Sequence, residues 1–563
     1  MQRPFVGVTR QNLLRELSAG VTLLAIAIPL NIGYAQIAGL PATAGLYALV
    51  VPTIVYALVV SSRQVVASPD AAAAALVASS IGGLAAAGSQ EYATMALAQA
   101  IICGVMFILL AAFKLGFLAN FLSKPILIGF VGGLALDILV SQVAKMLGIS
   151  INSGGEFVEK IGDLIGQLGT TNVWALGISA LSVAVLLVGK RLLAVVPWAL
   201  IVMVAATLAV MAAGLADRGV AVLGEVPAGA PTLTWPMLEW QTWLLLIPSA
   251  MALTLVTTAE GLLVSRSYGE KRHYRTDPNR DLLAFGVANL AAGAQGSFAV
   301  GSSTSRTAAM DQSGSRTQLP SLVLAAGTLL LLLFGTGLLE GIPSPAIGAI
   351  VGVAILPLLG VKEFADLWRR DRFEFTIGAL CFLVTLLVGS IPGILTAFVL
   401  ALINMARRAS RPAIDVLTAD DEPSASLLEG SPRGGFTAPG VIVVRMAAPL
   451  FFANADVFAT AVRSAVDGAG ADDVKHVVID MEAVTDADVT AAESFESLAE
   501  WLAARRISLS FSRLRPAARP RFDRLGILGD HAIYDTNRAA VAALVDHRHP
   551  PDSRQHKKEG TPT

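Results

Sequence analysis

Long apolar runs separated by short polar breaks occupy the chain from about residue 17 to about residue 410. Many of them reach about 18 residues or more, which is the length at which an apolar helix can cross a bilayer. After residue 412 the pattern changes to one that is ordinary for a soluble domain. The sequence therefore predicts a polytopic α-helical membrane domain over residues 1–411, followed by a soluble domain.

The polar breaks divide the membrane domain into fourteen predicted spans. Fourteen spans form two halves of seven, and because seven is odd the second half enters the membrane with the opposite orientation. This is the inverted-repeat plan of many secondary transporters. The third and tenth spans hold corresponding places in the two halves, and both are short or polar for a span. The predicted spans are 17–39, 44–61, 69–86, 92–113, 122–147, 173–189, 194–214, 242–265, 281–297, 303–313, 317–339, 345–360, 373–390 and 392–409.

Basic residues alternate between the two sides of these predicted spans. Lys190 and Arg191 follow the sixth span and Arg407 follows the fourteenth, whereas the acidic Glu340 follows the eleventh. Because cytoplasmic loops collect Lys and Arg, the loops after even-numbered spans are predicted to be cytoplasmic. We therefore expect a multi-pass protein of the cell (inner) membrane whose N and C termini both lie in the cytoplasm.

The overall composition supports a membrane protein and gives no sign of several other classes. Hydrophobic residues make up 54% of the chain and charged residues 15%, against about 25% charged in soluble domains. The net charge of −1 favours no nucleic-acid partner. Cys103 and Cys381 both lie in apolar runs, so neither a disulfide framework nor a zinc site is expected. No catalytic triad, phosphate-binding loop or metal cluster stands out, and we expect no enzyme, no cofactor and no bound metal.

The start of the third span suggests a helix that begins inside the membrane. The stretch 62–68, "SRQVVAS", contains β-branched residues and predicts a short extended segment. Ser68 is expected to cap the helix that follows, Pro69 suits the first helical turn, and Asp70 suits the positive end of the helix dipole. The alanines that follow have small side chains, so an anion and the facing helices can come close to this helix.

The start of the tenth span has the same arrangement. In the stretch 296–310, "GSFAVGSSTSRTAAM", an extended glycine-rich piece precedes possible capping residues from Ser302 to Ser305. Two helix N-termini that meet near the middle of a membrane form an anion site, and Arg306 would add a full positive charge. The alternative interpretation is two ordinary re-entrant segments.

Carboxylates inside apolar spans are a second signal of function. Glu260 lies in the apolar stretch 253–265, and an ionisable residue within a membrane is a functional hypothesis by default. We predict that Glu260 takes and releases the coupling proton, and the alternative is an ion pair with Arg306 that stabilises the domain. Asp137 is another buried acid with no partner evident in the sequence, and we expect a structural role for it.

Four stretches carry a resemblance to a known family. They are 28–47 "IPLNIGYAQIAGLPATAGLY", 66–78 "VASPDAAAAALVA", 269–293 "GEKRHYRTDPNRDLLAFGVANLAAG" and 301–319 "GSSTSRTAAMDQSGSRTQL". Together they resemble the SulP family, also called solute carrier family 26. The resemblance covers about residues 10–548, and the soluble part resembles the STAS domain of that family.

The resemblance implies a seven-plus-seven inverted repeat with a mobile core domain and a gate domain, often in a homodimer. It implies that an anion binds between the starts of spans three and ten and that the core moves like an elevator. At the position of Glu260 the family carries its coupling acid, which binds a proton or, in some bicarbonate carriers, is an Asp that binds sodium. Tyr34 matches an aromatic position that lines the family's site, with core packing as the alternative. The predicted anion-binding residues are Tyr34, Ala71, Ala72, Ser303, Thr304, Ser305 and Arg306, with Thr304 and Ser305 nearest the anion.

Two positions depart from that pattern. Many sulfate carriers of the family have Gln where this chain has Leu30, so sulfate is less favoured as the substrate. Asp70 carries a charge that repels an anion, and either capping of its own helix or binding of a cation explains it. The candidate substrates are sulfate, bicarbonate and small dicarboxylates, with protons favoured over sodium as the coupling ion. The alternatives are an uncoupled anion channel or exchanger, and a membrane sensor that acts through its STAS domain.

The soluble part alternates predicted strands and helices, which favours an α/β domain. Residues 412–435 are predicted to be a linker, 436–548 the STAS domain and 549–563 a disordered, basic tail. A cytoplasmic protein partner is expected for this domain. Thr490 matches a phosphorylated position of related bacterial domains, although a cap at Asp488 or Thr490 is the favoured role. The predicted strands are 441–455, 476–484 and 508–514, and the predicted helices are 456–468, 491–505, 518–525 and 537–546.

Overall fold

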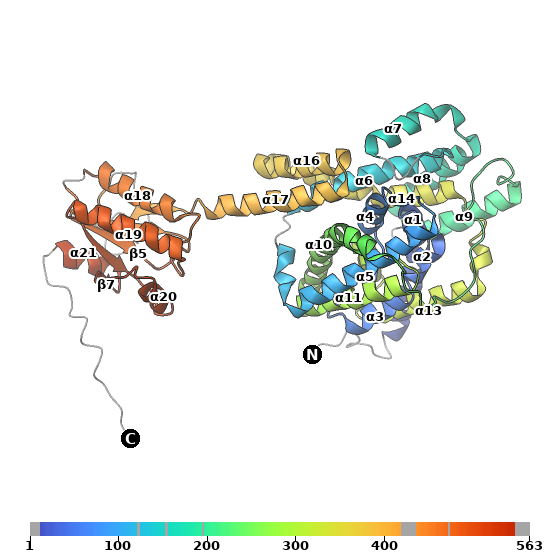
Figure 1. Ribbon diagram of the computed structural model, residues 1–563. Helices are drawn as coiled ribbons and strands as arrows, with labels where there is room; N and C mark the ends of the chain where they lie inside the picture. The colour runs from blue at the N-terminus through green and yellow to red at the C-terminus, as the bar shows by residue number, and fades with distance from the viewer. Residues whose placement is uncertain are drawn as a thin grey trace, which may run out of the picture. The chain divides into compact units, whose positions relative to one another are not determined.

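The computed structural model describes residues 12–120, 124–151, 156–193, 196–417, 435–470 and 473–545. The chain divides into two compact units, Met1–Ala401 and Leu402–Thr563 (Figure 1). The first unit is helical apart from one pair of two-residue strands, and the second contains a five-stranded sheet covered by helices.

Helices of very different length build the first unit. Its first half comprises α1 (Leu13–Ile37), α2 (Ala42–Tyr47), α3 (Val51–Val59), α4 (Ala71–Ile81), α5 (Gln90–Ala112), α6 (Lys124–Leu147), α7 (Phe157–Gly166), α8 (Val173–Leu192) and α9 (Trp198–Ala213). Its second half comprises α10 (Trp240–Lys271), α11 (Pro278–Ala294), α12 (Thr304–Gln312), α13 (Leu319–Phe334), α14 (Ser344–Ile355), α15 (Val361–Arg370), α16 (Arg372–Leu387) and α17 (Ser390–Ala409), which continues past Ala401.

Among the described residues, seven helical segments are long and apolar enough to cross a membrane by length and composition. The helices α4, α9 and α13 are apolar but shorter. The polytopic helical architecture is therefore confirmed, while the number of fourteen spans stays a prediction. The helix α7 was not predicted, because its charged residues Glu159, Lys160 and Asp163 interrupt the apolar pattern.

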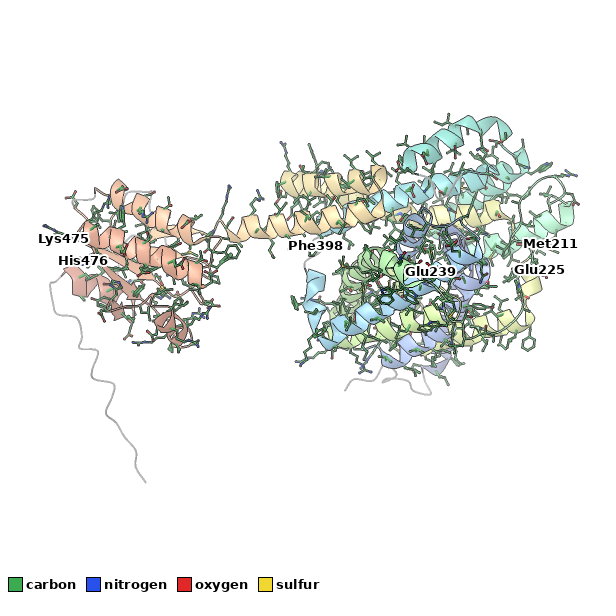
Figure 2. All side chains as sticks on the ribbon, viewed as in Figure 1. Met211, Glu225, Glu239, Phe398, Lys475 and His476 are labelled. Atoms are coloured by element: carbon green, nitrogen blue, oxygen red, sulfur yellow. The ribbon has the colours of Figure 1, made fainter. Side chains whose placement is uncertain are left out.

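Helices of the first half pack against helices of the second half. The closest pairs are α5 with α11, α6 with α16, and α1 with α13. Small residues allow these approaches, as expected for helices that associate within a membrane. At Gly133 of α6, an added Cβ would lie 2.9 Å from the backbone oxygen of Phe382 in α16. Side chains fill the spaces between these helices (Figure 2).

The second unit is an α/β domain with the strand order β3-β4-β5-β6-β7. The edge strand β3 runs antiparallel to β4, and the other neighbours are parallel. Strand β5 begins at His476, beside Lys475 (Figure 2). The strands are β3 (Ile414–Leu417), β4 (Val441–Met446), β5 (His476–Asp480), β6 (Ser508–Ser512) and β7 (Ala532–Tyr534), and the helices are α18 (Ala455–Gly468), α19 (Val489–Ala504), α20 (Arg519–Arg524) and α21 (Asn537–Val545).

Two strands of this sheet differ from the sequence prediction. Strand β3 lies inside the range 412–435 that was expected to be a linker, and β7 was not predicted at all. Both are short edge strands, and a segment of three or four residues carries too little periodicity to be recognised. Residues 418–434 of the predicted linker and the predicted tail 549–563 lie outside the described residues.

The start of α19 decides one of the open alternatives in this domain. Asp488 is the N-cap of α19, and its Oδ1 accepts a hydrogen bond from the Ala491 backbone N–H at 2.8 Å. Its Oδ2 accepts from the backbone N–H of Phe452 at 2.9 Å. Thr490 is exposed in the first turn of the helix. The favoured cap is thus Asp488 and not Thr490.

Candidate functional site

Two short strands bring the starts of the third and tenth predicted spans together. Strand β1 (Ala67–Ser68) pairs antiparallel with β2 (Gly301–Ser302). The pairing continues beyond the strands, because the Ser303 backbone N–H donates to the carbonyl of Val66 at 3.0 Å. The N-termini of α4 and α12, which immediately follow the two strands, therefore lie beside each other.

Each half-helix begins with a side-chain cap. The Asp70 Oδ1 accepts from the Ala73 backbone N–H at 2.7 Å, and the Ser303 Oγ accepts from the Arg306 backbone N–H at 3.4 Å. The prediction that Ser68 caps α4 is wrong, since Ser68 lies in β1 and Asp70 holds the N-cap position. Ser and Asp cap helices about equally well, so composition alone does not choose between them. The role of Asp70 as a cap is thereby observed.

Arg306 is completely buried at the junction of the two halves. Its Nε donates to the Ser303 Oγ at 2.8 Å, and its Nη2 donates to the carbonyl oxygen of Pro69, just before α4. Its guanidinium carbon lies 5.6 Å from the centre of the Tyr34 ring in α1, close enough for a cation–π interaction. Its Nη1 has no hydrogen-bond partner among the described residues.

The predicted alternative of an ion pair between Glu260 and Arg306 is not formed in this structure. Within the described parts of the chain, no carboxylate lies within 4.0 Å of the Arg306 guanidinium. Glu260 lies partly buried on α10, which packs against α4 and β2. Its carboxylate makes no hydrogen bond or ion pair with any described residue, and the charge that acts on it is that of Asp70.

The Asp70 carboxylate is held tightly between the two halves. An added Cβ at Gly301 of β2 would lie 2.5 Å from the Asp70 Oδ2 and 3.3 Å from the Thr257 Oγ1 of α10. A glycine at position 301 therefore makes room for this carboxylate. The opposite charges of Asp70 and Arg306 attract each other. One guanidinium and two carboxylates, those of Asp70 and Glu260, thus share the site.

The remaining predicted residues differ in their accessibility. Tyr34, Ala71, Ala72 and Ser303 are buried, whereas Thr304 and Ser305 at the start of α12 are exposed. The Ser305 hydroxyl lies 3.5 Å from the Ser303 hydroxyl. Leu30, at the position that departs from the family pattern, is buried on α1. The structure therefore gathers all the predicted anion-site residues around the starts of α4 and α12.

Two other acids of the helical unit are held in ion pairs. Asp137 on α6 is 2.8 Å from the Nζ of Lys160 on α7, a partner that sequence reasoning missed because α7 was not predicted. Asp311, in the last turn of α12, is bound by Lys271 at 3.0 Å, Arg272 at 2.7 Å and Arg316 at 3.5 Å. These pairs join α7 to α6 and α12 to the end of α10. Among the described residues, no group of three or more His, Cys, Asp or Glu could hold a metal ion.

Many apolar helices, with two capped half-helices paired at their starts, define a multi-pass membrane transport domain. The model of the sulfate permease family matches residues 13–381, and the model of the STAS domain matches residues 437–540. The chain belongs to the sulfate permease (SulP) family of membrane anion transporters.

Similar proteins span nearly the whole chain. The "Probable sulfate transporter MT1781" of Mycobacterium tuberculosis is 33% identical over 543 residues, which cover 94% of this chain and 95% of that protein. The chloroplastic sulfate transporter 4.1 of Arabidopsis thaliana is 28% identical, with 88% of this chain and 74% of that protein covered.

The murine solute carrier 26 family member A9, an anion transporter solved in the inward-facing state, has the same fold. It superposes with a TM-score of 0.86 at 20% identity and covers 96% of this chain and 92% of its own. The transmembrane domain of a cyanobacterium bicarbonate transporter, BicA, gives a TM-score of 0.62 at 22% identity, over 69% of this chain and 98% of that domain.

Proposed function

We propose that this chain is a secondary active transporter that carries small anions by proton-coupled symport with an elevator-like alternating-access movement. The observation that carries the proposal is the buried Arg306, whose Nη1 lacks a partner beside the starts of two half-helices. A buried charge is costly unless it is paired. An anion at this place would accept from Nη1 and interact with the positive ends of α4 and α12.

The exposed Thr304 and Ser305 support the same location for the anion. They stand at the first positions of α12, so their hydroxyls and backbone N–H groups can meet an anion that arrives from water. Arg306 is the third residue of the same first turn and is shielded from solvent. In this arrangement the hydroxyls bind the anion and Arg306 stabilises its charge over a short distance in a medium of low dielectric constant.

The balance of charge supports proton coupling. With Asp70 and Glu260 both ionised, the site carries one more negative charge than Arg306 can neutralise, and an anion is repelled. Protonation of Glu260 removes that excess, so anion binding and proton binding favour each other. Asp70 is the poorer candidate for the coupling acid, because its carboxylate is engaged as the cap of α4.

For the substrate, we propose a small oxyanion. The names of the similar proteins favour sulfate. Against sulfate, the apolar Leu30 stands where many sulfate carriers of the family have Gln, and the fold neighbour BicA is a bicarbonate transporter. Homodimer formation, cytoplasmic termini and a protein partner for the STAS domain remain predictions of the sequence.

The test is uptake of radiolabelled sulfate, bicarbonate and succinate into proteoliposomes with an imposed pH gradient. A lower pH outside the proteoliposomes than inside should accelerate entry of the transported anion. Glu260→Gln should abolish the effect of the gradient, and Arg306→Gln should abolish uptake itself. If the gradient has no effect and Glu260→Gln transports like the wild type, proton coupling is wrong. Anion currents that do not depend on the pH gradient would instead indicate an uncoupled channel.

A further inference from the structure

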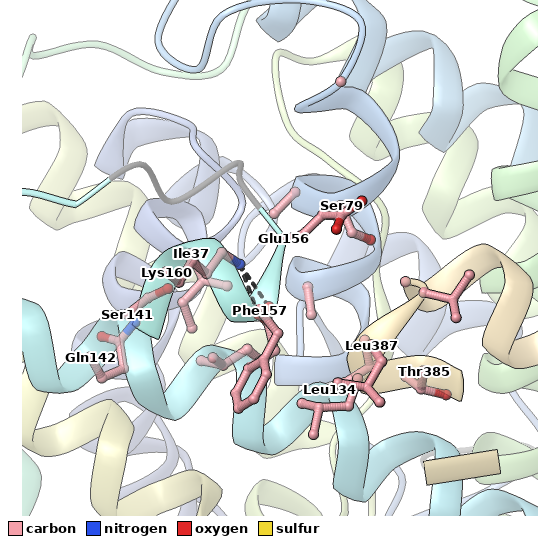
Figure 3. Close-up of a pocket in the computed structure, with 18 of the residues that line it drawn as sticks. Ile37, Ser79, Leu134, Ser141, Gln142, Glu156, Phe157, Lys160, Thr385 and Leu387 are labelled. Atoms are coloured by element: carbon pink, nitrogen blue, oxygen red, sulfur yellow. Dashed lines mark hydrogen bonds and ion pairs between the residues drawn. The ribbon is translucent and has the colours of Figure 1, made fainter. Parts of the chain in front are cut away.

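A second polar cavity lies further along α4, away from the starts of the half-helices. It has a volume of about 290 Å³ and is enclosed by α4, α6, α7, the end of α1 and the segment that follows α16 (Figure 3). From Ala72 at the proposed anion site to Ser79 at this cavity, α4 extends about 10 Å, given its rise of roughly 1.5 Å per residue. The same helix therefore joins the two places.

An unsatisfied amide points to a ligand in this cavity. Gln142 of α6 is 1% exposed and lines the cavity. Neither its Nε2 nor its Oε1 has a hydrogen-bond partner among the described residues. Buried polar groups are nearly always hydrogen-bonded, and an amide with both ends unpartnered indicates that something else occupies the space beside it.

Two lysines and two acids line the cavity, and one of the lysines forms an ion pair with neither acid. Lys160 is only 6% exposed, and its Nζ donates to both carboxylate oxygens of Asp137, at 2.9 and 2.8 Å. Glu156 is exposed at the start of α7. Among the described residues, the Nζ of Lys145 on α6 donates only to the side-chain oxygen of Gln36, at 3.2 Å, and no carboxylate lies within 4.0 Å of it. The cavity thus presents a free amide and an unpaired ammonium one helical turn apart.

We propose that this cavity is a second subsite for the transported anion, on the path between the proposed site and the membrane face where α7 lies. This inference rests on the proposed function. A small oxyanion accepts hydrogen bonds from the Lys145 Nζ and the Gln142 Nε2. The Gln142 Oε1 accepts from a water molecule that the anion keeps or from a hydroxyl of a protonated oxyanion.

The size of the cavity fits this occupant. One water molecule takes about 30 Å³ of liquid, so about 290 Å³ holds a small oxyanion with part of its hydration shell. The Lys160–Asp137 pair forms the wall on the side of α7 and contributes no net charge. An anion that stops here has shed part of its water before it meets Arg306.

The test compares transport from the two faces of the membrane. Right-side-out and inside-out vesicles containing the full chain are supplied with radiolabelled sulfate or bicarbonate, whichever the wild type takes up. Lys145→Gln should raise the KM about tenfold for entry from the face of α7 and leave the KM for entry from the opposite face near the wild-type value. Lys145→Arg should restore most of the affinity. The control is Lys362→Gln on α15, an exposed lysine away from the cavity.

A second variant separates binding from packing. Gln142→Met removes both unpartnered polar atoms while keeping the shape of the side chain. The subsite requires that Gln142→Met also raise the KM from the face of α7 only. If each variant changes the KM equally for entry from the two faces, or leaves both KM values unchanged, the cavity is not a subsite. If the wild type takes up none of sulfate, bicarbonate and succinate, the proposed function itself is overturned, which is a different outcome.

Discussion

At the scale of single residues, opposite charges on the two half-helices define the site. Arg306 belongs to α12 but donates to the Pro69 carbonyl of the other half, while Asp70 belongs to the start of α4 and lies against Gly301 of β2. The charged residue of each half therefore contacts the backbone of the other half. Asp70 weakens the attraction of the site for an anion, and this cost is offset by its hydrogen bond to the first turn of α4.

Asp70 offers a test in which capping and charge are separated. Asp70→Asn keeps a side-chain oxygen for the Ala73 N–H but removes the negative charge, so we expect tighter anion binding, measured as a several-fold lower KM in uptake. Asp70→Ala removes the cap as well and should lower the free energy of unfolding by about 1 kcal/mol, measured as a lower Tm of the purified protein. An unchanged KM in Asp70→Asn would show that the carboxylate does not act on the anion.

The sequence suggested the candidate site residues through their types and missed their contacts. Small residues and hydroxyls before Arg306 were sufficient to suggest an anion site. They did not show that the cap of α4 is Asp70 and not Ser68, because this depends on where β1 ends, and β1 ends at Ser68, opposite the start of β2 at Gly301. In the same way Asp137 had no visible partner until α7 brought Lys160 within 2.8 Å.

At the scale of elements, helix crossings depend on glycines that admit a neighbouring backbone. The crossing of α6 and α16 is an example, since an added Cβ at Gly133 meets the Phe382 carbonyl at 2.9 Å. That contact involves backbone, which cannot move aside as a long side chain can. The apolar pattern predicted α6 and α16 as spans but did not show that they cross each other.

A matched pair of glycine substitutions tests this crossing. Gly133→Val should separate α6 from α16 and lower the Tm of the purified protein, with a cost of about 1–3 kcal/mol for overpacking. Gly177→Val on α8 is the control, since a Cβ there meets nothing within 4 Å. Equal losses in both variants would mean that helix propensity, and not the crossing, determines the effect.

Short elements escaped the sequence prediction for a common physical reason. The helix α7 and the strands β3 and β7 each bury few residues. The apolar residues of α7 recur at helical spacing, but its charged residues and its short length distinguish it from a membrane span. The two strands are too short for their periodicity to be recognised. Strand β3 is ordered by its partner: Ile414 to Leu417 pair with Met446 to Val443 of β4, and Leu417 is fully buried. Tertiary pairing, which a single sequence does not display, decides whether such segments become strands.

At the scale of the whole molecule, the chain consists of two units with separate hydrophobic cores. The STAS unit includes β3, which lies before the range matched to the STAS domain at residues 437–540. Without β3, the buried strand β4 would become an exposed sheet edge, which invites association with other chains.

We expect the soluble unit to need this edge strand. A fragment of residues 412–548 should unfold cooperatively and stay monomeric, whereas a fragment of residues 436–548 should have a lower Tm and associate at high concentration. Thermal unfolding followed by circular dichroism, with sizes measured by light scattering, provides the comparison. Identical behaviour of the two fragments would show that β3 contributes nothing to this unit.

Transport itself should depend on the first unit. All the residues gathered around Arg306 lie within Met1–Ala401, so deletion of residues 436–563 should leave uptake per folded molecule within about twofold of the wild type. The measurement is proteoliposome uptake normalised to the amount of monodisperse protein. A complete loss of uptake by well-folded protein would show that the STAS domain takes part in the transport cycle.

The contacts beside the β1–β2 pairing also bear on the state of the proposed site when no anion is bound. Because Arg306 is fastened to the Pro69 carbonyl and to Ser303, departure of the anion does not set the guanidinium free to move. An unloaded molecule therefore keeps its shape and its fixed charges. If Glu260 carries the coupling proton, as proposed, the net charge of the unloaded molecule on its return across the membrane depends on whether Glu260 has released that proton. Tracer counterflow and net flux would then differ in their response to membrane voltage.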